Sequence, residues 1–300
     1  MITVKDIHKT YGTQPVLTGM NFTIENGKIV GLLGPNGSGK TTMIRLLNGV
    51  ILPDRGEMSI NGFSSTIDGH TIRQMSGIVT ESAGLYHEMS GEDNLTFFGE
   101  VYGIRKVKER VRELLNEFDL YDHRTKMVGA YSTGMKKRLA LAKALLHKPA
   151  LLFLDEPTNG LDPDGIRDVM HYLKKLNQNE KTTILICSHV LHQLEDICDS
   201  YIFMENGRVL AEGALRELEE TFQTGIKLKL ETGLKVEGTI WFGYPVERIN
   251  ESTILFTLQS KNDISPLLKT ILEKTWVHSA SIENLSLESV YFEVRRRNNG

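Results

Sequence analysis

Three short apolar runs stand out along the first two thirds of the chain, and each has the length of a β-strand. They occupy residues 28–33, 150–154 and 183–187. Both faces of these runs are mainly apolar, which is typical of strands covered on two sides. A turn and then a segment with helical spacing follow each run. This alternation predicts an α/β fold with a parallel sheet.

Three Asn-Gly pairs lie beside segments of strand-like composition: Asn26-Gly27, Asn61-Gly62 and Asn206-Gly207. Asn-Gly is the preferred sequence of a tight hairpin turn, because both residues tolerate positive φ. We therefore expect an antiparallel hairpin at each pair, and antiparallel strands near both ends of the first unit.

Residues 91–148 contain no convincing strand pattern. Their apolar residues recur at intervals of three and four, as in Val111, Leu114, Leu115 and Phe118. This spacing predicts amphipathic helices. A helical subdomain is therefore expected before the second core strand, which follows it at 150–154.

The pattern changes after a charged stretch that ends at Glu220. New short strands are expected at 226–230, 253–258 and 276–280, with a helix from Ser265 and a closing helix over 287–294. We place a domain boundary near Glu220. The chain is thus predicted to hold a first domain over 1–220 and a small α+β domain over 221–300.

The composition is that of a globular protein, with 40% hydrophobic and 24% charged residues among 300. Lys and Arg number 35 against 38 Asp and Glu, so no basic surplus favours nucleic acid or anionic lipid. Cys187 and Cys198 stand in apolar stretches without a Cys-x-x-Cys pattern, which predicts small buried side chains and a reducing compartment. No apolar run approaches the roughly 20 residues needed to cross a bilayer, and the start lacks a secretory pattern.

A phosphate-binding loop is predicted at residues 34–41, which read GPNGSGKT and fit the pattern G-x-x-x-x-G-K-[ST]. The segment follows a predicted buried strand and precedes a helical run. Its glycines allow successive N–H groups to point at phosphate oxygens, and Lys40 adds a charge for the β and γ phosphates. Thr41 would give its hydroxyl to Mg²⁺. A glycine-rich turn without a ligand is the plain alternative.

Two acids, Asp155 and Glu156, follow the strand at 150–154, at the end where α/β sheets place their ligands. Asp155 is the expected Mg²⁺ partner. Glu156 is positioned to orient or deprotonate an attacking water, because phosphoryl transfer depends on placing the nucleophile and neutralising charge. Two acids alone would indicate a solvated loop, whereas beside a phosphate loop they indicate nucleotide hydrolysis.

Residues 131–135, Tyr-Ser-Thr-Gly-Met, resemble the signature motif L-S-G-G-Q of the ATP-binding cassette (ABC) ATPases. Ser132 and Gly134 are retained, and the variant is similar to those of drug, ion and polysaccharide exporter ATPases. A serine and backbone N–H groups at a helix start form an anion cradle. The resemblance implies that this cradle is offered to the γ-phosphate held by a second cassette. A simple helix cap by Ser132 is the plain alternative.

Other motifs of the family follow in order over residues 1 to about 215. The resemblance implies a D-loop at Asp162, a γ-phosphate switch at His189, adenine stacking on Tyr11, and a Mg²⁺ contact by Glu81 where the family usually has Gln. For His189 and Tyr11, structural packing is the plain alternative. The implied nucleotide contacts are Tyr11, Asn36, Gly37, Ser38, Gly39, Lys40, Thr41, Thr42, Glu81, Ser132, Gly134 and Asp162. Lys40, Glu156 and His189 are the implied catalytic residues, and Thr41, Asp155 and Glu81 the implied metal ligands.

The resemblance implies a P-loop cassette with an antiparallel β subdomain, which uses ATP and Mg²⁺ and pairs with a second copy or a related cassette. A separate membrane permease would dock near Leu85, Tyr86 and Met89 from the cytoplasmic face; internal packing of these residues is the alternative. The end of the chain, over 285–293, resembles the closing motif of daunorubicin-resistance and sodium exporters, which indicates export. An ABC ATPase that acts on ribosomes or nucleic acid is the alternative function, although no nucleic-acid partner is expected.

Overall fold

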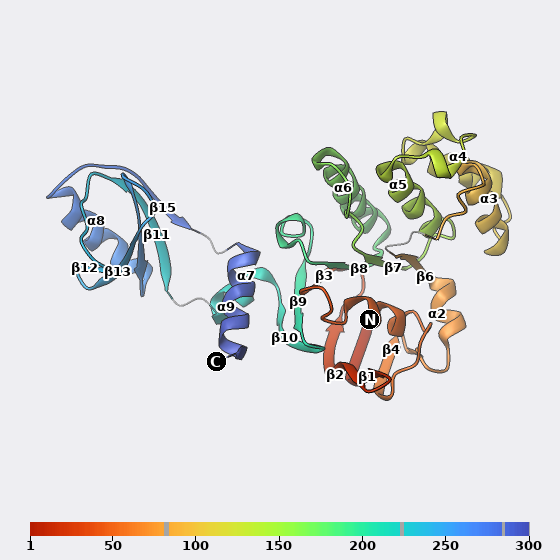
Figure 1. Ribbon diagram of the computed structural model, residues 1–300, viewed down its shortest axis with the longest axis horizontal. Coiled ribbons are helices and arrows are strands. Elements are labelled where there is room, and N and C mark those ends of the chain that lie inside the picture. The colour runs from red at the N-terminus through yellow and green to blue at the C-terminus, as the bar shows by residue number, and fades with distance from the viewer. Residues whose placement is uncertain (81–83, 223–224, 284–285, 300) are drawn as a thin grey trace. The chain divides into compact units, whose positions relative to one another are not determined.

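The computed structural model describes residues 1–80, 84–222, 225–283 and 286–299 (Figure 1). Contacts divide the chain into two units, Met1–Leu215 and Arg216–Gly300. None of the helices in the described ranges is long and apolar enough to cross a membrane.

A six-stranded sheet forms the centre of the first unit, in the order β10-β9-β3-β8-β7-β6. All neighbouring strands run parallel except β9 and β10. The strands predicted at 28–33, 150–154 and 183–187 are confirmed as β3, β7 and β8, three of its four interior strands. The bounds are β3 Ile29–Leu33, β6 Ser76–Val79, β7 Leu151–Asp155, β8 Thr183–Ser188, β9 Ser200–Glu205 and β10 Arg208–Gly213.

Alternate residues of this sheet enter one hydrophobic core. Val30 and Leu32 of β3, like Phe153 of β7, pack with helix α1 (Lys40–Leu47) and with a second sheet. β3, β7 and β8 are buried at every position, and helices α5 (Thr133–Ala144) and α6 (Pro163–Glu180) lie on the other side of the sheet in Figure 1. The apolar character of both strand faces therefore reflects cover on both sides.

The second sheet is antiparallel, in the order β2-β1-β4-β5. It adjoins helix α1 and helix α2 (Gly69–Met75). Its strands form the β subdomain expected from the sequence, with bounds β1 Ile2–Tyr11, β2 Gln14–Ile24, β4 Arg55–Ile60 and β5 Phe63–Ser64.

Two of the three expected Asn-Gly hairpins are confirmed. Asn61-Gly62 joins β4 to β5 and Asn206-Gly207 joins β9 to β10, with positive φ at all four residues. The hairpin expected at Asn26-Gly27 is wrong, because β2 and β3 belong to different sheets. There Gly27 is held by β8 and α6 instead: its N–H donates to Thr183 Oγ1 (2.8 Å), and its carbonyl accepts from Asn177 Nδ2 (2.8 Å).

The predicted helical subdomain is confirmed between β6 and β7. Its helices are α3 (Gly91–Val101), α4 (Val107–Glu117) and α5, with short 3₁₀ turns at Tyr121–His123 and Val128–Ala130. Ser90 begins α3 by accepting from the N–H of Asp93 (3.1 Å), and Ser132 begins α5 by accepting from the N–H of Met135 (3.2 Å). Side-chain oxygens thus satisfy otherwise free donors at both helix starts.

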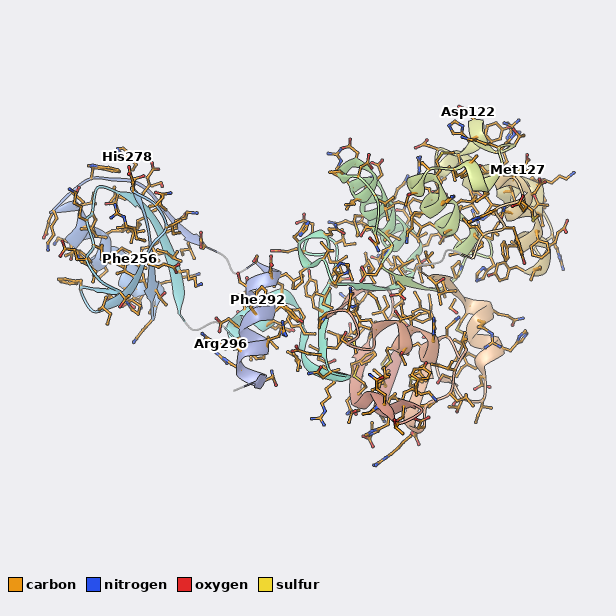
Figure 2. The ribbon with its side chains drawn as sticks, viewed as in Figure 1. Asp122, Met127, Phe256, His278, Phe292 and Arg296 are labelled. Carbon is orange, nitrogen blue, oxygen red and sulfur yellow. The ribbon has the colours of Figure 1, made fainter. Side chains whose placement is uncertain are left out.

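The second unit contains a five-stranded sheet in the order β12-β13-β14-β11-β15, with helix α8 (Ile264–Leu272) against it. Phe256 lies inside this unit and His278 at its surface (Figure 2). The strands are β11 Ile226–Thr232, β12 Ile240–Trp241, β13 Tyr244–Arg248, β14 Thr253–Leu258 and β15 Val277–Glu283. Helices α7 (Leu215–Phe222) and α9 (Leu287–Asn299) are joined by Arg297, which donates to the carbonyls of Thr221 and Phe222 (both 3.0 Å).

Candidate functional site

The phosphate loop lies between the end of β3 and the start of α1. Gly37 and Gly39 have φ of 81° and 104°, a region that side chains rarely adopt. No side chain caps α1, so its first N–H groups remain available to an anion. The hydroxyl of Ser38 is buried without a hydrogen-bond partner. The loop is therefore shaped as an anion cradle, and it carries a buried polar atom that is left unsatisfied.

Lys40 places a cation in this loop although its side chain is buried. Its ammonium donates to the carbonyl oxygens of Gly34 (2.8 Å) and Pro35 (3.1 Å). Both acceptors are neutral, so a bound phosphate would be the one of the three partners that carries an opposite charge. The geometry is suited to a lysine that binds a phosphate oxygen.

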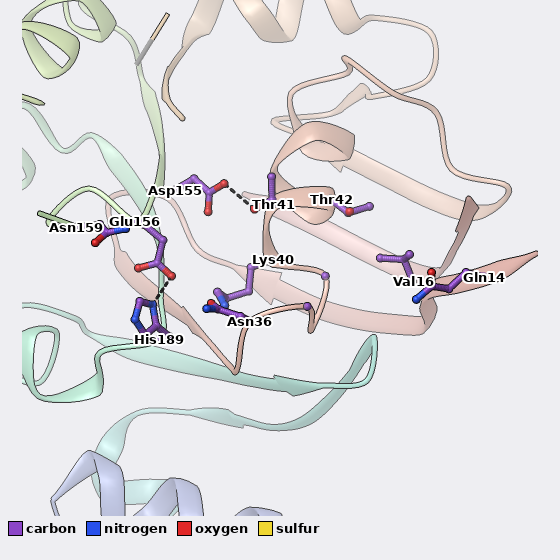
Figure 3. A pocket seen from close by; sticks show the side chains of 12 residues that line it. Gln14, Val16, Asn36, Lys40, Thr41, Thr42, Asp155, Glu156, Asn159 and His189 are labelled. Atoms are coloured by element: carbon purple, nitrogen blue, oxygen red, sulfur yellow. Dashed lines mark hydrogen bonds and ion pairs between the residues drawn. The ribbon is translucent and has the colours of Figure 1, made fainter. Parts of the chain in front are cut away.

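The side chains of Thr41 and Asp155 are in contact in this site. The Thr41 hydroxyl donates to Asp155 Oδ2 at 2.7 Å (Figure 3). Asp155 ends β7 and is 4% exposed, so its carboxylate is held in place by the sheet. Hydroxyl and carboxylate oxygens are the ligands that Mg²⁺ accepts next to phosphates, and this pair fits such an ion.

Glu156 and His189 form a second pair at the ends of adjacent strands, β7 and β8. His189 Nδ1 lies 2.8 Å from Glu156 Oε1 (Figure 3). The Ser188 hydroxyl donates to Glu156 Oε2 at 3.3 Å. The side chain of Glu156 is 14% exposed and that of His189 is 41% exposed. A carboxylate oriented in this way can accept a proton from a water molecule that enters from the open side.

One cavity of about 480 Å³ brings these groups together. Sequence reasoning missed three of its lining residues, Gln14, Val16 and Asn159. Gln14 and Val16 belong to β2 of the antiparallel sheet. They reach the phosphate loop only because the two sheets pack together, so no local sequence motif identifies them. The lining residues are Gln14, Val16, Asn36, Gly37, Gly39, Lys40, Thr41, Thr42, Asp155, Glu156, Asn159 and His189.

Tyr11 does not line this cavity. It ends β1 and is 45% exposed, with the Lys9 ammonium 5.9 Å from its ring centre. Adenine stacking on Tyr11 stays a prediction. Glu81, the expected Mg²⁺ contact in the usual Gln position, lies outside the described residues.

Ser132, Gly134 and Asp162 line a different cavity, of about 510 Å³. Ser132 begins α5, and Asp162 begins α6 by accepting from the N–H of Gly165 (3.0 Å). The starts of two helices therefore line this cavity, together with Arg138. Of the predicted site residues that the structure describes, Tyr11 and Ser38 line neither cavity, and the others fall into two groups, those of the phosphate cavity and those of this signature cavity.

Neither cysteine takes part in chemistry at the site. Cys187 lies in β8, and burial raises the pKa of its thiol well above the usual value. Burial raises the pKa of Cys198 as well. Both are free thiols; Cys187 is buried as predicted, whereas Cys198 is only half-buried.

Comparison with known proteins gives consistent matches. The family model described as ABC transporter matches residues 17–159. An uncharacterized ABC transporter ATP-binding protein, YxlF of Bacillus subtilis (strain 168), is 34% identical over 98% of this chain and 99% of its own length. The daunorubicin resistance ATP-binding protein DrrA3 of Streptomyces coeruleorubidus is 38% identical over 73% of this chain and 69% of its own length.

Among solved structures, the chain resembles the dimeric post-hydrolysis state of the ATP-binding cassette MJ0796 bound to ADP and Pi. That chain is 26% identical with a TM-score of 0.67, over 72% of this chain and 99% of that one. The match confirms the expected P-loop cassette.

Proposed function

Since the chain belongs to the ABC transporter ATP-binding proteins and is an ATPase, we propose that it powers export through a separate membrane subunit. Two cassettes would close head to tail around ATP, hydrolysis would reopen them, and the membrane subunit would follow this cycle.

The separation of the two cavities supports the head-to-tail arrangement. The phosphate cavity holds Lys40 and Glu156 but no group of the signature motif, and the signature cavity holds Ser132 and Gly134 but none of the phosphate loop. Each chain thus presents two half-sites of about 500 Å³. A γ-phosphate that bridges Lys40 of one chain and Ser132 of another would complete both, and would favour the closed dimer over the open one.

Within the phosphate cavity each residue has a distinct task in hydrolysis. Lys40 and the N–H groups at the start of α1 would hold the β and γ phosphates, and Thr41 with Asp155 would hold Mg²⁺. The bound ion supplies charge neutralisation for the phosphates. Glu156 would accept the proton of the attacking water, and His189 fixes the Glu156 carboxylate by the 2.8 Å contact.

An exposed aromatic cluster, formed by Tyr86, Phe97 and Phe98, supports docking of a membrane subunit on the helical subdomain. Tyr86 is 48% and Phe97 39% exposed. The Tyr86 ring lies 5.3 Å from Phe97 and 5.7 Å from Phe98. Leu85 and Met89, also expected on this surface, are only half-exposed. Tyr86 is thus the best candidate among the three predicted contacts.

The loop that carries Tyr86 is fixed by Asn94, a fully buried residue of α3. Asn94 Oδ1 accepts from the N–H of Tyr86 (2.8 Å), and Nδ2 donates to the carbonyls of Tyr86 and Ser90 (both 2.9 Å). A preorganised aromatic surface loses little entropy when a partner binds. The loop is therefore suited to transmit force between the cassette and a membrane protein.

Affinity capture tests the proposal. The tagged Glu156→Gln chain would be recovered with ATP from gently solubilised membranes of its native host. We expect a polytopic membrane protein in equal amount, and its identity would narrow the substrate. Recovery of ribosomes or nucleic acid without a membrane protein would contradict the transporter assignment and favour the alternative function.

Phe97→Asp in the same capture experiment is expected to lower recovery of the membrane protein about tenfold, because an interface centre tolerates an unpaired charge poorly. Ile67→Asp is the matched control: Ile67 is 84% exposed and outside the aromatic cluster, and its replacement should leave recovery unchanged. Equal recovery with both variants would exclude this docking surface.

Ser132→Ala tests the signature half-site. Loss of the cap should reduce the free energy of unfolding by about 1 kcal/mol, and loss of the phosphate contact should lower the ATPase rate about tenfold. Ser90→Ala removes an equivalent cap from α3, so it should lower the free energy of unfolding by a similar amount and leave the ATPase rate unchanged. Thermal unfolding and phosphate release distinguish the two effects. An equal rate in both variants would leave Ser132 a helix cap only.

A further inference from the structure

Lys137 is a buried lysine on the signature helix α5 that faces the catalytic strand end. It is 7% exposed, and its ammonium donates to the backbone carbonyl of Glu156 at 3.1 Å. A buried ammonium is costly unless it is well paired. The Glu156 carbonyl is one such partner, and Lys137 reaches it from a position five residues after Ser132.

The backbone of Glu156 has an unfavourable conformation. Its φ is 50°, in the left-handed region that disfavours side chains with a Cβ. The N–H of Glu156 donates to the carbonyl of Cys187 (3.0 Å), and its carbonyl also accepts from the N–H of Asn159 (3.3 Å). Such a conformation persists only where surrounding bonds determine it, and the Lys137 bond is the one charged member of this set.

The same helix also touches the segment that follows Glu156. A Cβ on Gly160 would lie 3.1 Å from Thr133 Cγ2, and one on Gly134 would lie 3.6 Å from Leu161 Cδ2. The start of α5 and residues 156–161 are therefore packed closely within one chain. A shift of α5 would be passed to the Glu156 peptide.

We propose that Lys137 is a positioning residue for hydrolysis, which holds the Glu156 peptide so that its carboxylate meets the attacking water. The inference rests on the catalytic role proposed for Glu156. Lys137 also connects the helix that offers Ser132 to one nucleotide with the backbone of the residue whose carboxylate acts on another. The Lys137 ammonium thereby links the two half-sites of a chain, in addition to the packing of α5 against residues 156–161.

The test compares steady-state ATPase kinetics of three variants. Lys137→Met keeps the length and apolar stem but removes the donor, and we expect kcat to fall about tenfold with KM for ATP within twofold. Lys137→Arg restores a cation and should recover most of kcat. Lys136→Met is the matched control, because Lys136 donates to the Gly129 carbonyl (3.3 Å) rather than to Glu156; its kinetics should not change.

A double-mutant cycle separates positioning from general support of the fold. On a Glu156→Gln background, Lys137→Met should change the residual single-turnover rate less than twofold, because no carboxylate remains to be positioned. An equal loss in both backgrounds, or an unchanged kcat in Lys137→Met alone, would overturn the proposal. If Lys137→Met and the shorter Lys137→Gln both fail to fold, Lys137 is a core residue and the proposal also fails. A wild-type rate in Glu156→Gln alone would instead refute the role of Glu156.

Discussion

Replacing Glu156 with glutamine is expected to reduce the ATPase rate about 1,000-fold while ATP still binds, since a general base contributes two to four powers of ten. Glutamine has nearly the same shape but cannot take a proton from water, so the phosphate cavity stays intact. Phosphate release measures the rate. Size-exclusion chromatography with light scattering should show an ATP-dependent dimer, because the nucleotide is no longer consumed.

Glu57→Gln is the control for this experiment. Glu57 is exposed on β4 of the antiparallel sheet and does not line the phosphate cavity, so its replacement should leave the rate unchanged. A Glu156→Gln rate within threefold of the wild type would show that another group activates the water. A variant that stays monomeric with ATP would argue against the head-to-tail dimer.

Lys40→Met is expected to weaken ATP binding about 100-fold, which corresponds to about 2.7 kcal/mol, in the range of a buried charge-assisted contact. The variant also lacks the donor to the carbonyls of Gly34 and Pro35. Equilibrium binding of ATP measured by calorimetry would quantify the loss. Affinity close to that of the wild type would show that backbone N–H groups alone hold the phosphates.

Lys28→Met controls for the loss of one positive charge. Lys28 precedes β3, is 45% exposed and lies 3.6 Å from Asp199, and an exposed pair of this kind contributes little. ATP affinity should stay within twofold. A similar loss in both variants would indicate a general electrostatic effect rather than a specific phosphate contact.

The main features of the fold could be predicted because they depend on local patterns. Strands covered on both faces are apolar throughout, and the strands at 28–33, 150–154 and 183–187 could therefore be recognised. The turn at Asn26-Gly27 could not, because the choice between a hairpin and a crossing to another sheet depends on Thr183 and Asn177, more than 140 residues away.

The hairpin between β12 and β13 was missed for the opposite reason. Its turn residues, Phe242 and Gly243, have φ of 52° and 85°, the conformation that Asn-Gly would ordinarily signal. Phenylalanine gives no such signal, and β12 has only two residues. A sequence pattern cannot identify a turn whose first residue is among the least suited to it.

Some residues of the site could be predicted from local motifs, and others could not. Motif residues such as Lys40 and Asp155 could be predicted to meet, because parallel strands bring their carboxyl ends to one edge of the sheet. Contact of Gln14 and Val16 with the same cavity depends on how the antiparallel sheet packs against the phosphate loop. The division of the signature and phosphate groups between two cavities likewise depends on the whole fold.

The left-handed backbone of Glu156 has a consequence for how this position can evolve. Glycine would adopt a φ of 50° without the penalty of about 1 kcal/mol that a Cβ brings there, but it would remove the carboxylate. Selection for a stable chain and selection for turnover therefore oppose each other at a single residue. Lineages that lose the need for ATP hydrolysis should therefore accept glycine here more readily than at the neighbouring Asp155, which lies in the extended backbone of β7, where glycine relieves no strain.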